Sequence, residues 1–254
     1  MLGPVETPAI EVRQLRKVYG SKAAVDGLDL TVPHGSFFGF LGPNGAGKTT
    51  TIRMLMGLAV PSGGSIELLG LPMPEHATAI KARIGLVPDE SLLFDGLTGP
   101  EFLEFVGRVY GLERSVARER SRELLSLFEL ESAGRKLIGE YSKGMRKRIA
   151  MSAALIHRPE LFLMDEPFEG VDAVGARLMK DLLVEQVRRG ATVFLTSHVL
   201  EVVERLCDRV AIINQGRLVL EGSMSEMHSG SETLEDMFVR VVGAERPAET
   251  LDWL

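Results

Sequence analysis

The sequence predicts an α/β fold built on a mainly parallel sheet, with an antiparallel sheet near the N-terminus and an inserted helical segment. Short apolar runs alternate with longer stretches of helical periodicity, which is the pattern of βαβ units. The runs that are compact and apolar enough to be strands buried on both faces are residues 37–41, 161–164, 192–196 and 210–213. These runs form the predicted core.

The N-terminal stretch has a different pattern. Residues 10–15 and 25–32 alternate apolar with polar side chains more than the later runs do, which favours an antiparallel sheet beside the parallel one. Farther along, Asn214-Gln215-Gly216 has the composition of a hairpin turn. We therefore expect a strand on either side of this turn.

A helical segment is inserted between the predicted strands. Thr98 and Glu101 have capping-box spacing ahead of the apolar positions of a helix, and Arg158-Pro159 ends the last helix of the segment. We interpret the whole chain, 1–254, as one domain. Its expected parts are a sheet-containing core at about 1–90 and 158–222, a helical subdomain at about 91–157, and a C-terminal part at 223–254 with an amphipathic helix at 232–242 and a mobile end at 245–254.

Composition indicates a soluble globular protein and limits its partners. Of the 254 residues, 45% are apolar and 25% are charged, and the net charge of -6 offers no basic field for a nucleic-acid backbone. Cys207 is the single cysteine, so an intrachain disulfide is impossible. No apolar run reaches the ~18 residues of a spanning helix, and Glu6 and Glu11 stand where a signal peptide is basic and then apolar. We expect a cytoplasmic protein that reaches a membrane only through a partner.

A glycine-rich loop directly follows the run at 37–41 and fits the phosphate-binding pattern. Its glycines let the backbone fold into a concavity of N–H groups around a β-phosphate, and the following helix offers its positive end. Lys48 would bring a mobile charge to the β- and γ-phosphate oxygens, and Thr49 would offer its hydroxyl to Mg²⁺. The residues expected to bind a nucleotide here are Gly42, Pro43, Asn44, Gly45, Ala46, Gly47, Lys48, Thr49 and Thr50.

The run at 161–164 ends in two carboxylates, Asp165 and Glu166. An unpaired carboxylate is costly at a buried strand end, so a cationic partner is expected there, and Mg²⁺ would serve. Asp165 is the predicted metal ligand. Glu166 is the predicted catalytic residue, placed to polarise the water that attacks the γ-phosphate.

Between these two motifs, residues 141–146 read YSKGMR and open a helix. With the glycine-rich loop, the acidic strand end and a later His198, this order resembles the ATP-binding cassette (ABC) family over nearly the whole chain. The resemblance implies a P-loop NTPase core that works as a dimer, in which the signature motif of one subunit closes over ATP bound to the other. Ser142 and Gly144 match contacting residues of that signature. The positions that depart from its commonest form are Tyr141, Lys143 and Met145.

Further positions match the family one by one. Tyr19 precedes the first glycine-containing turn, where the family stacks an aromatic ring on adenine. Asp172 falls in the family's D-loop, which crosses the dimer interface. His198 matches the switch histidine that contacts the γ-phosphate, so the resemblance implies a catalytic role for it beside Glu166 and Lys48.

One departure from the family bears on the metal. The family has a glutamine at the turn that joins the sheet to the helical subdomain, where it meets Mg²⁺ and the attacking water, and Asp89 stands there in this chain. Aspartate is shorter and charged, so it could bind the metal and could repel the γ-phosphate when no metal is present. Asp89 is therefore a third candidate metal ligand beside Thr49 and Asp165.

These matches predict an ATPase that uses ATP and Mg²⁺, pairs with a second identical or related ABC subunit, and powers separate transmembrane permease subunits at the inner face of the cell membrane. The stretches at 37–50 and 141–146 resemble subunits that serve ABC-2 type export permeases. Two alternatives stay open. One is a soluble ABC ATPase that acts on a cytosolic partner, as in iron–sulfur assembly, and the other is a subunit that binds ATP without hydrolysing it.

Overall fold

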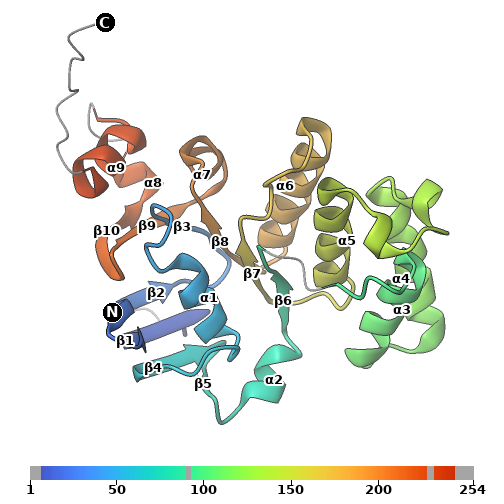
Figure 1. The fold of residues 1–254 in the computed structure, drawn as a ribbon, viewed down its shortest axis with the longest axis horizontal. Helices are drawn as coiled ribbons and strands as arrows, with labels where there is room; N and C mark the ends of the chain where they lie inside the picture. The colour runs from blue at the N-terminus through green and yellow to red at the C-terminus, as the bar shows by residue number, and fades with distance from the viewer. Residues whose placement is uncertain (1–6, 90–92, 228–231, 244–254) are drawn as a thin grey trace, which may run out of the picture.

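The computed structural model describes residues 7–89, 93–227 and 232–243, and its centre is a six-stranded sheet. The strand order is β10-β9-β3-β8-β7-β6, and neighbours are parallel except in the β9–β10 hairpin (Figure 1). The bounds are Phe37–Leu41 (β3), Ile84–Val87 (β6), Leu161–Asp165 (β7), Thr192–Ser197 (β8), Arg209–Asn214 (β9) and Arg217–Ser223 (β10). The predicted apolar runs are confirmed as the adjacent strands β9, β3, β8 and β7, while β6 is an edge strand beyond those predicted.

Both faces of this sheet are covered, which explains why its inner strands are apolar throughout. In β7, Phe162 and Met164 belong to a hydrophobic core on one face, whereas Leu161 and Leu163 belong to a second core on the other. The first core includes residues of the inserted helices and of the helices after β7; the second is shared with α1 and the N-terminal sheet. The helix bounds are Lys48–Leu55 (α1), Ala77–Lys81 (α2), Gly99–Val109 (α3), Arg114–Leu127 (α4), Lys143–Leu155 (α5), Ala173–Arg188 (α6), Leu200–Leu206 (α7), Met224–Met227 (α8) and Leu234–Val242 (α9).

The second sheet is four-stranded and antiparallel, in the order β2-β1-β4-β5. The predicted antiparallel pair is confirmed, but both strands are longer than predicted because they continue to a tight turn at Gly20, where φ is 57°. This extension carries Tyr19 and Lys22 to the cavity that also contains the glycine-rich loop. The bounds are Ile10–Tyr19 (β1), Lys22–Val32 (β2), Gly63–Leu68 (β4) and Leu71–Met73 (β5).

The inserted segment is helical, as predicted, and lies at the β6 end of the large sheet (Figure 1). Its first helix has the predicted capping box, since Glu101 N donates to Thr98 Oγ1 over 3.4 Å and Thr98 N donates to Glu101 Oε2 over 2.9 Å. Phe102 is buried in the core, whereas Phe105 and Val109 of the same helix are 47% and 66% exposed. The predicted start of the segment, at 91, lies outside the described residues.

The C-terminal predictions are also met where the structure describes them. Gln215 and Gly216 have φ angles of 48° and 81°, as a two-residue hairpin turn requires, and they join β9 to β10. The helix expected at 232–242 is α9, whereas the end at 245–254 lies outside the described residues. Within the described parts of the chain, no helix has both the length and the apolar character needed to cross a membrane.

His157, just after α5, gives the fold a specific acid sensitivity. Its ring stacks on Tyr110 with centroids 3.6 Å apart, and its Nε2 lies 3.1 Å from the Ile84 carbonyl oxygen. Burial lowers the pKa of His157 from 6.5 to about 4. The folded state thus keeps this ring neutral at pH values where the unfolded chain protonates it. The contribution of His157 to the unfolding free energy is therefore fully present above pH 6.5 and is lost as the pH falls toward 4.

We expect His157→Phe to remove this component. Phenylalanine keeps the ring stack on Tyr110 but cannot take up a proton. Between pH 7 and pH 5 the wild type should lose about 2 kcal/mol more unfolding free energy than the variant. Urea unfolding at both pH values measures the difference, and identical losses in the two proteins would contradict the assignment.

Candidate active site

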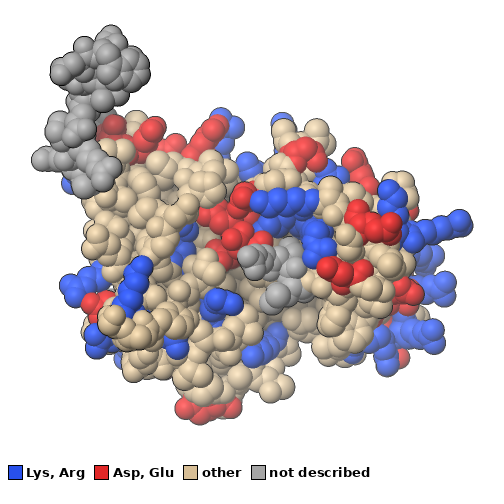
Figure 2. All heavy atoms as spheres, in the orientation of Figure 1, with Lys and Arg blue, Asp and Glu red and all other residues tan. Residues whose placement is uncertain are grey.

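A cavity of about 690 Å³ opens where the carboxyl ends of the parallel strands meet the glycine-rich loop. In Figure 2 a group of acidic side chains lies at the centre of this face, between the sheet and the helical segment. The predicted residues that line the cavity are Tyr19, Pro43, Asn44, Gly45, Gly47, Lys48, Thr49, Thr50, Asp89, Asp165, Glu166 and His198. The lining residues beyond the prediction are Lys22, Ala24 and Glu169.

The loop between β3 and α1 needs glycine for steric reasons. Gly47 has φ 115°, and a Cβ there would lie 2.5 Å from the Ala24 carbonyl oxygen. A Cβ on Gly42 would collide with the Ile213 carbonyl oxygen. Gly42 and Ala46 are buried below the cavity, where Ala46 N donates to the Pro43 carbonyl over 3.1 Å. These two support the loop from beneath rather than line the cavity.

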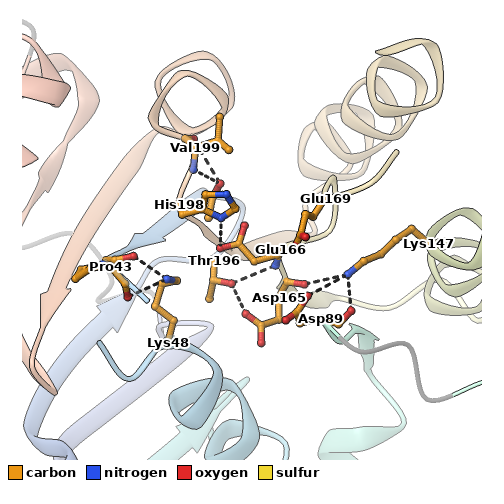
Figure 3. Close-up of polar contacts among 12 residues, drawn as sticks. Pro43, Lys48, Asp89, Lys147, Asp165, Glu166, Glu169, Thr196, His198 and Val199 are labelled. Atoms are coloured by element: carbon orange, nitrogen blue, oxygen red, sulfur yellow. Dashed lines mark hydrogen bonds and ion pairs between the residues drawn. The ribbon is translucent and has the colours of Figure 1, made fainter. Parts of the chain in front are cut away.

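Lys48 begins α1 and is only 7% exposed. Its Nζ donates to the carbonyl oxygens of Gly42 over 2.7 Å and Pro43 over 3.3 Å, so the amine is held within the loop (Figure 3). Burial lowers the pKa of this amine, and the charges of Glu166 and Asp165 act in the opposite direction. The carboxylates of Glu166 and Asp165 only partly compensate the buried charge of Lys48. A phosphate in the cavity would be a nearer counterion for this amine.

Asp165, at the end of β7, is 2% exposed. Thr196 lies opposite it on β8 and donates its Oγ1 hydrogen to Asp165 Oδ1, while the same hydroxyl oxygen accepts from Glu166 N over 3.2 Å. Thr196 therefore fixes both acidic residues. Thr196 was not among the predicted site residues, although it directly precedes Ser197 and His198 in the sequence.

Glu166 has an unusual backbone for a residue with a side chain. Its φ is 47°, in the left-handed region, and its N–H is held by both oxygens of Thr196. Its carboxylate is 13% exposed, and Oε1 lies 3.0 Å from His198 Nδ1, while the His198 ring itself is 51% exposed (Figure 3). A carboxylate held in this way faces the cavity beside an imidazole that can donate to it or to a bound anion.

The signature residues lie outside the cavity in a single chain. Ser142 is the N-cap of α5, and its hydroxyl accepts from Met145 N over 3.3 Å. A Cβ on Gly144 would lie 3.1 Å from the Gly170 carbonyl oxygen. Lys143, between Ser142 and Gly144, forms an ion pair with Glu169 at 2.7 Å.

Asp172 also lies outside the cavity. It caps α6, because its Oδ1 accepts from Gly175 N over 2.9 Å, and its other oxygen is paired with Arg148 of α5. The structure therefore brings the phosphate loop and the acidic edge together but leaves Ser142, Gly144 and Asp172 apart from them.

The remaining predicted residues lie at the rim. Tyr19 ends β1 and is 51% exposed, and Lys17 Nζ lies 4.9 Å from the centroid of its ring. Thr49 and Asp89 are exposed to the same cavity as Asp165. One hydroxyl and two carboxylates are hard oxygen donors of the kind Mg²⁺ prefers, and Mg²⁺ usually completes its octahedron with waters and substrate phosphates. No cluster of at least three histidine, cysteine, aspartate or glutamate side chains suited to a metal occurs among the described residues.

Three features define a P-loop nucleotide hydrolase. They are the parallel sheet, the phosphate loop after β3, and the acidic end of β7, which is two strands away from β3 in the sheet. The sequence profile of the family described as "ABC transporter" matches residues 25–169. The chain belongs to this family, as its resemblance implied, and it is an ATP-binding subunit that hydrolyses ATP.

Individual relatives and a solved structure agree with this assignment. The chain is 42% identical over 219 residues to a Nod factor export ATP-binding protein I of Paraburkholderia xenovorans, covering 86% of this chain and 72% of that protein. It is 41% identical over 237 residues to a daunorubicin resistance ATP-binding protein of Streptomyces coeruleorubidus, covering 92% and 75% of the two chains. A solved structure described as the ATP-binding subunit of an ABC transporter aligns with a TM-score of 0.86 at 28% identity, over 92% of this chain and 99% of that one.

Proposed function

We propose that the chain hydrolyses ATP at a site completed by a second ABC subunit and thereby drives an export permease of the ABC-2 type. One observation carries this proposal: Lys48, Glu166 and His198 surround one cavity, whereas Ser142 and Gly144 lie outside it. A cavity that lacks its signature residues is half of a composite site. The whole chain, 1–254, is one nucleotide-binding domain with a helical subdomain at about 91–157.

Within one chain, each residue has a defined task. Backbone N–H groups of the loop cradle the phosphates, Lys48 turns from its carbonyl partners to the β- and γ-phosphates, and Tyr19 stacks on the adenine. Asp165 and Thr49, with Asp89, would hold Mg²⁺, which neutralises charge on the phosphates. Glu166 orients the attacking water and accepts its proton, and His198 holds the Glu166 carboxylate and contacts the γ-phosphate.

The second subunit supplies the donors that this cavity lacks. Ser142 and Gly144 at the positive N-terminal end of the partner's α5 would cover the γ-phosphate, and Asp172 would lie at the interface between the subunits. Closure excludes water other than the nucleophile and aligns the reacting groups. Loss of the γ-phosphate then reopens the dimer, because the phosphate that joins the two chains is gone.

The export assignment draws support from the relatives, which are named for Nod factor export and daunorubicin resistance. These names favour a transporter subunit over an ATPase of iron–sulfur assembly. We place the chain in the cytoplasm, at the inner face of the membrane, and expect no nucleic-acid partner. Phe94, Phe105 and Val109 form an exposed apolar patch on the helical segment, with the rings of Phe94 and Phe105 edge to face at 5.4 Å between centroids. A permease loop is the partner that would bury this patch.

A pull-down tests this function. The tagged chain, purified from detergent-solubilised cells, should carry a polytopic membrane protein and show Mg²⁺-dependent ATPase activity. Phe105→Glu should reduce the recovered membrane protein by about tenfold, since a buried charge in an apolar contact is costly. Val239→Glu, at a 60% exposed apolar position on α9, is the matched control. Recovery of soluble partners alone would support the cytosolic ATPase instead, and bound ATP without turnover would support a non-hydrolysing subunit.

A further inference from the structure

Lys147 is a buried lysine that does not line the nucleotide cavity. It lies on α5, five positions after Ser142, and is only 2% exposed. Figure 3 shows its side chain reaching from α5 toward the ends of β6 and β7, where Asp89 and Asp165 lie. Its Nζ donates to the carbonyl oxygens of Asp89 over 2.8 Å, Pro88 over 3.2 Å and Asp165 over 3.5 Å.

These contacts match the chemistry of an ammonium group. It has three N–H donors and no acceptor, and the backbone carbonyls occupy all three. The Asp89 carboxylate lies 3.8 Å away and provides a counter-charge, although Asp89 itself is exposed to the nucleotide cavity. A buried ammonium is costly unless it is held in this way, so replacing it would release the turn that carries Asp89 and the strand end that carries Asp165.

Lys147 lies on α5, the helix whose N-terminus carries the signature residues Ser142 and Gly144. Ser142 caps α5, and Lys147 follows within the next turns of that helix. A continuous helix transmits a shift along its axis because its rise per residue is fixed. The position of Ser142 is therefore tied, through Lys147, to the carboxyl ends of β6 and β7 in the same chain.

We propose that Lys147 is a positioning residue that sets the signature helix against the catalytic edge of its own chain, and so couples the two composite sites of the dimer. This inference rests on the proposed function. Each α5 would cover the nucleotide held by the partner, while Lys147 ties it to the Asp89–Asp165 edge that serves the nucleotide of its own subunit. A change at one site would then alter the fit of the other.

Lys147→Met tests this role, because methionine fills a similar volume without donors or charge. Nucleotide affinity of the single chain, measured without Mg²⁺ with a fluorescent ATP analogue, should stay within about threefold because Lys147 does not touch the phosphate loop, whereas kcat with Mg²⁺ should fall about tenfold. In the Glu166→Gln background, the ATP concentration needed for dimerisation, followed by light scattering, should rise about tenfold. Lys147→Gln, whose shorter amide cannot span the same distance, should behave alike and serves if the methionine variant does not fold. Lys136→Met, at an exposed lysine of the helical segment, is the control.

The outcomes separate this inference from the proposed function. Lys147→Met could lower the melting temperature and yet match Lys136→Met in kcat and in ATP-induced dimerisation. Lys147 would then only stabilise the fold, which would overturn the inference and leave the proposed function intact. Absence of ATP-induced dimerisation in the Glu166→Gln parent, or of turnover in the wild type, would overturn the proposed function and the inference with it.

Discussion

Glu166→Gln should reduce ATP turnover by about 10²- to 10⁴-fold while leaving ATP bound, because the amide keeps the shape of the side chain but cannot accept a proton. The backbone of Glu166 is held by Thr196 and does not depend on the carboxylate. The γ-phosphate should therefore stay in place between two subunits, and an ATP-filled dimer should accumulate. Steady-state phosphate release and size-exclusion chromatography with ATP measure the two effects.

Glu169→Gln is the matched control for this result. Glu169 lines the same cavity, but its carboxylate is more exposed and is paired with Lys143. Its change should alter turnover by no more than about threefold, as is usual for an exposed ion pair. Unchanged turnover in Glu166→Gln would refute its role as the base, and an equal loss in both variants would show that the site responds to total charge rather than to one carboxylate.

Lys48→Ala should weaken ATP binding by about 100-fold, because two charge-assisted hydrogen bonds to phosphate oxygens are lost from a buried site. Alanine also leaves the carbonyl oxygens of Gly42 and Pro43 facing the phosphates without the amine between them. Titration calorimetry with ATP gives the dissociation constant. Since the lysine is buried, the effect should persist at high salt.

Lys22→Ala tests whether the loss of affinity in Lys48→Ala comes from the Lys48–phosphate contact or from the loss of any positive charge near the cavity. Lys22 lines the same cavity from β2 but is exposed, so its loss should change affinity only about threefold and less at high salt. Equal losses for the two lysines would contradict the special position of Lys48 in the loop.

The parts of the fold that could be predicted are the elements whose burial gives a recognisable pattern of apolar residues in the local sequence. The strands β3, β7, β8 and β9 are covered on both faces, so the central residues of each form an apolar run. In contrast, β4 begins with Gly63-Gly64-Ser65 and has only Ile66 and Leu68 buried, so it lacks such a run. The loop could be placed because it directly follows the apolar run of β3, and the acidic pair because it directly follows the apolar residues 161–164 of β7.

Contacts between distant segments could not be predicted in the same way. Thr196 reaches Asp165 only because β7 and β8 pair in one register, which local sequence does not encode. Lys147 would ordinarily be taken for a solvated helical lysine, but in the fold it is buried, with its amine at the carboxyl ends of β6 and β7. The role of Lys143 is another case, since its ion pair with Glu169 joins the signature to a loop that follows β7.

The most direct test of the shared site is to mix two inactive variants. Lys48→Ala removes the phosphate-loop lysine, and Ser142→Asp keeps the helix cap but places a negative charge against the γ-phosphate. A dimer of one chain of each kind contains one intact site, so mixing equal amounts should restore turnover, up to about a quarter of the wild-type rate if the two sites act independently. If the mixture stays as inactive as its components, although both are folded and Ser142→Asp still binds ATP, the nucleotide is not hydrolysed between two chains.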